Sequence, residues 1–175
     1  MLSEIFSSNK RIQALEYILY QDTATVSSVV TELTLSKGFV SEFLHLLHQN
    51  DILSKNKGYH PTNTPLTKAI KIILNINKIK LSRIKKPFMT GIGLYGSWAQ
   101  GTNMQRSDLD IWIKTEKYPN EKELAHLSKI LREMTHSDIQ LLVITPQKLE
   151  QIKKDTPFYL SLRYNSRLLW GEPIE

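Results

Sequence analysis

Two aspartates separated by a single residue, Asp108 and Asp110, are spaced so that their carboxylates could act together in chemistry. Successive side chains on a β-strand alternate between its faces, so both carboxylates project to one side while Leu109, Ile111 and Ile113 point into a core. Neighbouring carboxylates repel each other by about 1 kcal/mol in water, and a divalent cation between them reverses the sign. Oxygen ligands that leave positions free for phosphate are typical of Mg²⁺ sites. Asp108 and Asp110 are therefore candidate metal ligands.

A glycine-serine pair, Gly96-Ser97, stands at the end of a short apolar strand shortly before these aspartates. A glycine at such a bend lets backbone N–H groups approach a ligand, and the start of a helix together with the Ser97 hydroxyl favours an anion. Gly101 ends the short turn and lets the chain return toward the aspartates. This order of cradle, return loop and acidic strand places a nucleoside triphosphate beside its metal.

The motif as a whole resembles the nucleotidyltransferase signature of the DNA polymerase beta superfamily. The residues that carry the resemblance are Gly96-Ser97, Ala99, Gly101 and Ser107-Asp108-Leu109-Asp110. The pattern is most similar to the minimal members, which include the MNT proteins and the kanamycin nucleotidyltransferases, sharply over residues 91–113 and loosely over 87–170. The resemblance implies Mg²⁺-dependent transfer of a nucleoside monophosphate from a nucleoside triphosphate, with ATP expected, to an unknown acceptor, either a protein or an RNA. It implies metal-binding and catalytic roles for Asp108 and Asp110, and nucleotide binding by Gly96, Ser97, Gly101 and Ser107.

The third carboxylate that the resemblance leads us to expect is ambiguous in this sequence. Asp138 and Gln140 share a face of the strand predicted at 139–144, and the usual acid falls about where Gln140 stands. Either Asp138 is the third catalytic residue, or the third ligand is lost and nucleotide binds with slow transfer or none. The second alternative favours a DNA-binding regulator whose nucleotidyltransferase-like domain binds nucleotide or dimerises without catalysis.

The first 60 residues predict three helices and a hairpin. Helical spacing of apolar residues indicates a helix over 9–20, Thr25 and Ser36 can cap two more, and residues 51–60 hold two extended pieces around a glycine-containing turn. This order resembles the winged helix-turn-helix domains of archaeal and bacterial regulators. The resemblance implies that the third helix and the hairpin contact DNA through Lys37, Ser41, His45, Lys55 and Lys57. A protein-protein or dimerisation module remains the alternative.

The remaining elements predict an α+β fold, a winged helix-turn-helix followed by a small mixed-sheet nucleotidyltransferase domain. A long amphipathic helix over 64–84 has an apolar stripe and a basic side. After it, strands near 92–95, 109–113 and 139–144 alternate with helices over 120–135, 146–154 and 157–165. We therefore expect a winged helix-turn-helix domain at 1–62, a connector helix at 63–87 and a nucleotidyltransferase domain at 88–175. The stripe consists of Leu66, Ile70, Ile73, Ile76 and Ile79.

Composition adds limits to these expectations. The net charge of +6 lies entirely in residues 1–86, with 12 basic and 6 acidic residues, whereas residues 87–175 hold 11 of each. This asymmetry suggests either contact with a polyanion or a solubilising surface. The absence of cysteine excludes disulfides and thiolate metal sites. Without a long apolar run or a signal-peptide pattern, we expect a cytoplasmic protein with no membrane partner; a homodimer is left open.

Overall fold

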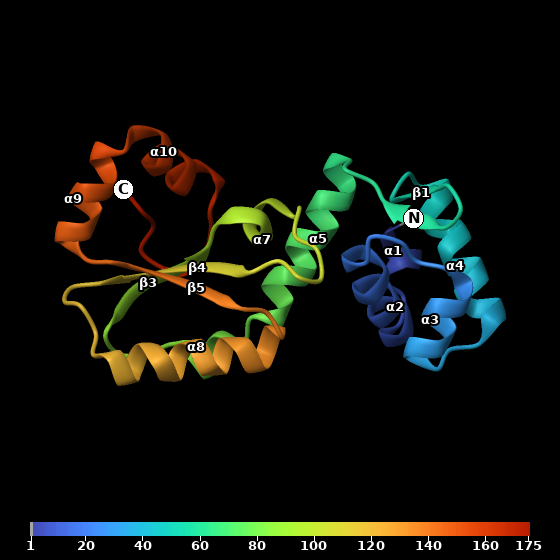
Figure 1. Cartoon of the computed structure of the whole chain (residues 1–175), viewed down its shortest axis with the longest axis horizontal. Coiled ribbons are helices and arrows are strands. Elements are labelled where there is room, and N and C mark those ends of the chain that lie inside the picture. The colour runs from blue at the N-terminus through green and yellow to red at the C-terminus, as the bar shows by residue number, and fades with distance from the viewer. Residues whose placement is uncertain (1) are drawn as a thin grey trace. The chain divides into compact units, whose positions relative to one another are not determined.

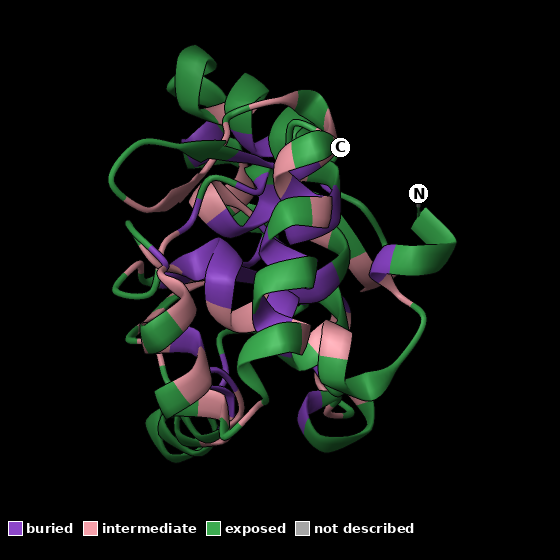
Figure 2. Ribbon diagram, turned by 90° about the vertical axis from the view of Figure 1, so that its right-hand side faces the viewer, coloured by how far each residue is buried: buried purple, intermediate pink, exposed green. Residues whose placement is uncertain are grey.

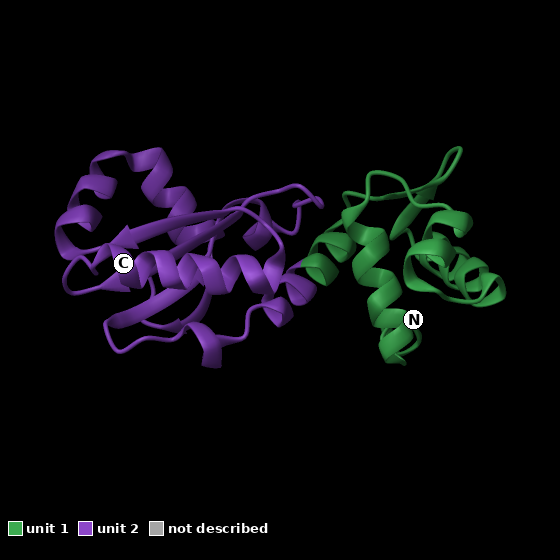
Figure 3. Ribbon diagram, turned by 60° about the horizontal axis from the view of Figure 1, so that its bottom comes forward, with its two compact units in different colours: residues 1–71 green, residues 72–175 purple. Residues whose placement is uncertain are grey.

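The structure, a computed structural model, describes residues 2–175. The chain divides into two compact units, residues 1–71 and residues 72–175, which Figure 3 shows in green and purple. The division falls inside the predicted connector at 63–87. The predicted first domain, 1–62, starts at Met1, which lies outside the described residues.

The first unit is built from helices and one hairpin (Figure 1). Ser8, Thr25 and Ser36 accept backbone hydrogen bonds at the starts of three helices, where N–H groups lack helical partners. The hairpin strands pair antiparallel, and a backbone bridge between Ala24 and Tyr59 attaches the hairpin to the segment before the second of the three predicted helices. Its elements are α1 (Leu2–Ile5), α2 (Asn9–Tyr20), α3 (Val26–Leu33), α4 (Lys37–Gln49), β1 (Leu53–Lys55) and β2 (Tyr59–Pro61).

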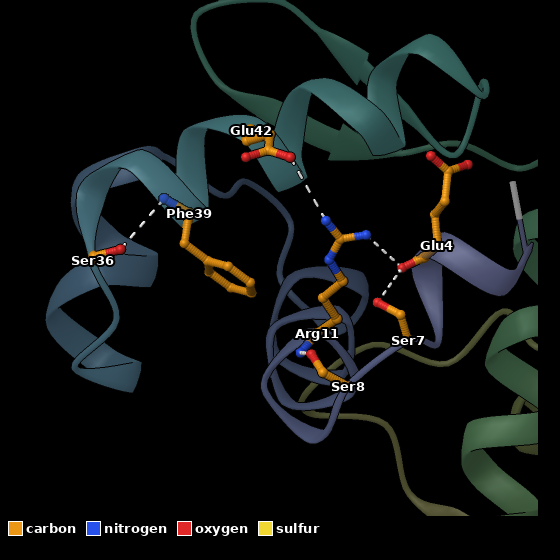
Figure 4. A network of polar contacts seen from close by, with 7 residues as sticks. All are labelled: Glu4, Ser7, Ser8, Arg11, Ser36, Phe39 and Glu42. Atoms are coloured by element: carbon orange, nitrogen blue, oxygen red, sulfur yellow. Dashed lines mark hydrogen bonds and ion pairs between the residues drawn. The ribbon is translucent and has the colours of Figure 1, made fainter.

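Arg11 on α2 joins three helices of this unit. Its Nη1 donates to the backbone carbonyl of Glu4 on α1 at 2.6 Å, and its Nη2 lies 3.7 Å from the Glu42 carboxylate of α4 (Figure 4). The guanidinium carbon lies 5.5 Å from the centre of the Phe43 ring. Because the Arg11 side chain is largely buried, it holds α1, α2 and α4 together. It also compensates the charge of the exposed Glu42.

Helix α5 (Pro65–Lys78) crosses the boundary between the units. The prediction of one helix over 64–84 is wrong, because α5 ends at Lys78 and a separate helical turn, α6 (Leu81–Ile84), follows. Ile79 and Ile84 are both buried in the core of the second unit. Tertiary packing of these two isoleucines therefore outweighs the helical pattern of the sequence.

The predicted stripe on α5 is also partly wrong. Ile73 and Ile76 are exposed, whereas Leu74 is buried. Lys71, expected on the polar side, is 3% exposed, and its ammonium lies 5.3 Å from the centre of the Tyr20 ring. Burial lowers the pKa of Lys71 to about 8. The buried side of α5 in the first unit thus includes the Lys71 side chain.

The second unit contains a four-stranded sheet in the order β5-β4-β3-β6. The strand β3 pairs antiparallel with β4 and β6, whereas β4 and β5 are parallel and joined by the crossover helix α8 (Glu121–Thr135). This mixed sheet with its helices confirms the predicted α+β class. The apolar run near the end of the chain forms the edge strand β6. The strands are β3 (Met89–Leu94), β4 (Leu109–Thr115), β5 (Ile139–Ile144) and β6 (Arg167–Gly171).

Helices cover both faces of this sheet. Figure 1 shows α8 on one face and α9 (Pro146–Lys154) with α10 (Thr156–Asn165) on the other. On the α8 face, Ile111 and Leu131 belong to a large buried cluster, and on the opposite face Trp112 packs with Ile152 in a smaller one. The buried parts of the strands and the exposed outer sides of the helices are visible in Figure 2. Within residues 2–175, we find no helix with the length and apolarity that a bilayer crossing requires.

Candidate active site

The candidate site begins where β3 ends. After Tyr95, the chain turns through Gly96, whose φ of +62° is in the left-handed region, into the short helix α7 (Gly96–Gln100). Gly101, at φ +68°, closes this helix, and its N–H donates to the carbonyl of Ser97. Two glycines with backbone conformations that side chains disfavour therefore define the start and the end of the turn.

Gly96 lies directly against Asp110 on the neighbouring strand. A Cβ atom added to Gly96 would overlap Asp110 Oδ2 and would stand 2.9 Å from Asp110 Cγ and 3.2 Å from its Cβ. The backbone N–H of Tyr95 also donates to the carbonyl of Asp110 at 3.1 Å. The absence of a side chain at Gly96 is thus what allows the glycine-serine bend and the acidic strand to meet.

The two aspartates differ in their surroundings. Asp108 is exposed just before β4, and Asp110 is half-buried within it, whereas the alternating residues Leu109 and Ile111 are fully buried on the α8 side. Burial and the negative charge of Asp108 raise the pKa of Asp110. The carboxylates therefore act on one another, and a cation between them would relieve the repulsion.

Trp112 continues the face of β4 that carries Asp110, but it does not border an open site. Its side chain is 1% exposed and packs with Ile144, Ile152 and Leu162. Gly93 on β3 stands opposite Trp112, and a Cβ there would lie 2.6 Å from the indole Cε2. The indole is part of the core beneath α9 and α10.

Gln140, and not Asp138, stands in register with Asp110. The parallel pairing of β4 and β5 aligns Asp110 with Gln140, whose Nε2 donates to Asp108 Oδ2 at 2.9 Å. Asp138 precedes β5, is exposed, and lies 3.5 Å from Arg132 of α8. The structure therefore brings Asp108, Asp110 and Gln140 together and places the Asp138 carboxylate beside an arginine.

The return loop between α7 and β4 has its own internal hydrogen bonds. The N–H of Thr102 donates to the Ser97 carbonyl at 3.0 Å. Ser107, predicted to bind nucleotide, accepts a hydrogen bond from the N–H of Met104 at 2.8 Å, and its own N–H donates to the Met104 carbonyl. The Ser107 hydroxyl thus shapes the turn that leads into Asp108.

Tyr95 is a neighbour of the site that the sequence did not reveal. It is half-buried and packs against the cluster around Trp112. Burial and the charge of Asp110 raise the pKa of the Tyr95 hydroxyl. Its position next to Gly96 was the available signal, but the side toward which it turns depends on the sheet.

The residues present suit a magnesium ion. Asp108 and Asp110 offer hard oxygen ligands, and proteins hold Mg²⁺ through one or two carboxylates together with substrate phosphates. In the described part of the chain, no group of three or more His, Cys, Asp or Glu side chains could hold a metal. The acid pair would therefore be the main contribution of the protein to such a site.

The residues predicted to contact DNA lie on the surface of the first unit. Lys37, Ser41 and His45 are exposed along α4. Lys55 and Lys57 are exposed at the hairpin, where the Lys55 ammonium lies 5.5 Å from the centre of the Tyr59 ring. All five side chains are accessible to a partner.

Comparison with protein families places the acidic strand in a known context. Residues 77–159 match the sequence model of the family described as polymerase beta, nucleotidyltransferase. This segment is a nucleotidyltransferase domain. It includes the glycine-serine bend, both aspartates and Gln140. The nucleotidyltransferase part of the predicted resemblance is thereby confirmed, and the winged helix-turn-helix stays a prediction.

Several solved structures resemble part of the chain. A complex of tri-AMPylated Shewanella oneidensis HEPN toxin with MNT antitoxin matches at 19% identity over 58% of this chain and 73% of that chain, with a TM-score of 0.40. A toxin-antitoxin structure with AMP-PNP matches at 24% identity over 62% and 75%, with a TM-score of 0.39. The MntA-HepT toxin-antitoxin matches at 26% identity over 57% and 73%, with a TM-score of 0.38. A comparison with curated proteins gives no match.

Proposed function

We propose that this chain is a Mg²⁺-dependent nucleotidyltransferase that moves a nucleoside monophosphate from a nucleoside triphosphate, ATP in the first place, to a protein or RNA acceptor. The contact between Gly96 and Asp110 supports the proposal most directly. It joins a glycine-serine bend, suited to phosphate, to a carboxylate pair, suited to a cation, within the segment that matches the nucleotidyltransferase family.

The proposed chemistry uses few groups of the chain. Backbone N–H groups at Gly96 and the Ser97 hydroxyl donate to the β- and γ-phosphates, and Asp108 and Asp110 would hold Mg²⁺. When bound, the cation neutralises phosphate charge and stabilises the attacking and leaving oxygens. A bond forms between the acceptor oxygen and the α-phosphorus as the bond to the bridging oxygen breaks. Pyrophosphate leaves, and the acceptor proton passes to a base.

The base is the open element of this scheme. Gln140 stands beside Asp110, and a neutral amide cannot take a proton. Asp138 is the candidate third carboxylate in the chain, and its pairing with Arg132 must open before it can serve. Transfer is therefore expected to be slow unless the acceptor supplies its own base.

We propose further that the first unit is a winged helix-turn-helix that binds DNA through α4 and the β1–β2 hairpin. The order of helices and hairpin and the exposed Lys37, Lys55 and Lys57 support it. The pairing of Glu42 with Arg11 reduces the repulsion that Glu42 would exert on phosphate.

A second function, favoured by the hydrogen bond from Gln140 to Asp108, is that of a DNA-binding regulator that binds nucleotide or dimerises without turnover. Here the amide would hold Asp108, and the acid pair would bind magnesium-nucleotide without activating an acceptor. This function shares the nucleotide site with the first and differs from it in the absence of transfer.

Incubation with Mg²⁺ and α-labelled ATP, alone and with cell extract, distinguishes the two functions. Label transfer that is abolished by Asp108→Ala but retained by Glu116→Ala, an exposed acid just beyond the same strand, supports the enzyme. Nucleotide binding without transfer, together with retarded migration of the protein's own promoter DNA, supports the regulator. Gln140→Glu should raise the transfer rate if the lost carboxylate limits it.

The DNA proposal has its own test. Lys55→Ala with Lys57→Ala should weaken retardation of promoter DNA and reduce its salt dependence, because two phosphate contacts are lost. Lys122→Ala, an exposed lysine of α8, removes a charge outside the first unit and serves as the control. If all variants retard promoter DNA equally, the hairpin is not part of the DNA interface.

A further inference from the structure

A pair of buried asparagines joins α5 to the return loop that follows α7. Asn75 on α5 is 0% exposed, and Asn103 in the return loop is 1% exposed. Asn75 Nδ2 donates to Asn103 Oδ1 at 2.9 Å, and Asn103 Nδ2 donates to Asn75 Oδ1 at 3.2 Å. Two amides, each distant from the other in the sequence, thus bind one another reciprocally inside the second unit.

Asn75 makes another hydrogen bond that reaches α7 itself. Its Nδ2 also donates to the backbone carbonyl of Trp98 at 2.8 Å. The last carbonyls of a helix have no partner within the helix, and a helix of five residues is not stable by itself in water. Asn75 therefore supplies a partner for the end of α7 and fixes the return loop with the same amide.

Lys78, also on α5, makes a further contact with α7. Its ammonium lies 5.9 Å from the centre of the Trp98 ring, and Trp98 is 3% exposed. The last turn of α5 thus contacts α7 through both the backbone and the side chain of Trp98. Neither contact involves the acidic strand.

We infer that Asn75 and Asn103 form a clamp that positions the nucleotide-binding turn. The inference rests on the proposed nucleotide site. The clamp holds α7 and the return loop, and these two segments carry Gly96 and Ser97 at one end and lead to Asp108 at the other. Asn75 and Asn103 touch no reacting atom in this scheme; they are positioning residues. Buried amides with complete hydrogen bonding fix a single arrangement, and an incomplete pair is costly, which suits this role.

The experiment measures two things on the full chain. Hydrogen exchange without nucleotide reports on the backbone amides of residues 96–108, and calorimetry with Mg²⁺ and a non-hydrolysable ATP analogue gives the dissociation constant. In Asn75→Ala we expect faster exchange in 96–108, unchanged exchange in 109–115, and an affinity at least about tenfold weaker. Asn103→Ala leaves the hydrogen bond from Asn75 to Trp98 available and applies the same test if Asn75→Ala does not fold.

The control separates positioning from general loss of stability. Leu131→Ala removes a fully buried side chain of α8 from the core of the same unit. It should destabilise the unit, yet the folded molecules should bind the analogue as the wild type does. The double variant Asn75→Ala/Asn103→Ala should lose about as much affinity as Asn75→Ala alone, because Asn75→Ala already removes the hydrogen bonds to both Asn103 and Trp98.

Each outcome decides a different statement. If the wild type binds magnesium-nucleotide and both asparagine variants bind it with the same affinity, the clamp is overturned and the proposed function stays intact. Equal loss of affinity in Leu131→Ala also overturns it, because the effect is then one of stability alone. If the wild type binds no magnesium-nucleotide, the proposed function fails, and the role of the clamp in nucleotide binding fails with it.

Discussion

Gly96→Ala is the substitution that most directly tests the contact between the bend and the acidic strand. An L-residue in the left-handed region costs about 1–2 kcal/mol. The new methyl group would also overlap Asp110 Oδ2 and stand 2.9 Å from Cγ, so the carboxylate must move. A displacement on the order of 1 Å at a reacting site can cost about 100-fold in rate. We therefore expect modest destabilisation but loss of most nucleotide affinity and transfer.

Calorimetry with magnesium and the ATP analogue, together with thermal unfolding, measures both effects. The matched control is Gly171→Ala on β6, where φ is +81° and a Cβ would stand 2.8 Å from Gly91 Cα. This control carries a similar backbone strain away from Asp108 and Asp110, so it should lower the melting temperature and leave the affinity of the folded protein unchanged. Wild-type affinity in Gly96→Ala, or equal losses in the two variants, would refute the reasoning.

Three further predictions concern charge and stability. Burial and the Asp108 charge raise the pKa of Asp110, so ionisation of this carboxyl destabilises the folded state at pH values above its unfolded pKa of 3.8. Asp110→Asn should therefore raise the melting temperature at pH 7 and lose that gain at pH 3. The variant should bind no magnesium-nucleotide. Arg11→Ala should destabilise the first unit by about 1–3 kcal/mol in chemical denaturation, since it removes a charged hydrogen bond and the contact with Phe43, and a null effect would contradict the anchoring role. Burial lowers the pKa of Lys71 to about 8, so the stability of the wild type should rise between pH 8 and 10.5 as the penalty for burying its charge is lost. Lys71→Met should be more stable than the wild type at pH 7 and should lack that rise. Parallel stability profiles of the two proteins against pH would contradict this.

Local signals in the sequence predicted most of the elements. The caps Thr25 and Ser36 fix helix starts because each side chain accepts a hydrogen bond from the backbone N–H three positions later. The largely apolar stretch from Ile139 to Ile144, in which Gln140 is the polar residue, predicted a strand at the observed bounds. These features depend on neighbours along the chain, so a single sequence contains them.

The misses depend on contacts between distant residues. Nothing near Ile79 breaks a helix, and the chain turns there because two isoleucines pack into the sheet. The run at Leu168 becomes a strand because β3 offers an edge. The meeting of Gly96 with Asp110 could be anticipated from the motif, whereas the pairing of Asn75 with Asn103 is a property of the folded chain alone.

The continuity of α5 has a practical consequence for dissecting this protein. The division between the compact units falls between Lys71 and Ile72, and a cut there would leave the second fragment with only seven residues of a fourteen-residue helix. So short a stub frays in water, and the asparagine at its middle would lose its fixed backbone. A fragment that contains the nucleotidyltransferase domain should therefore start at Thr64, before the proline of the first turn, even though this carries residues of the other unit along.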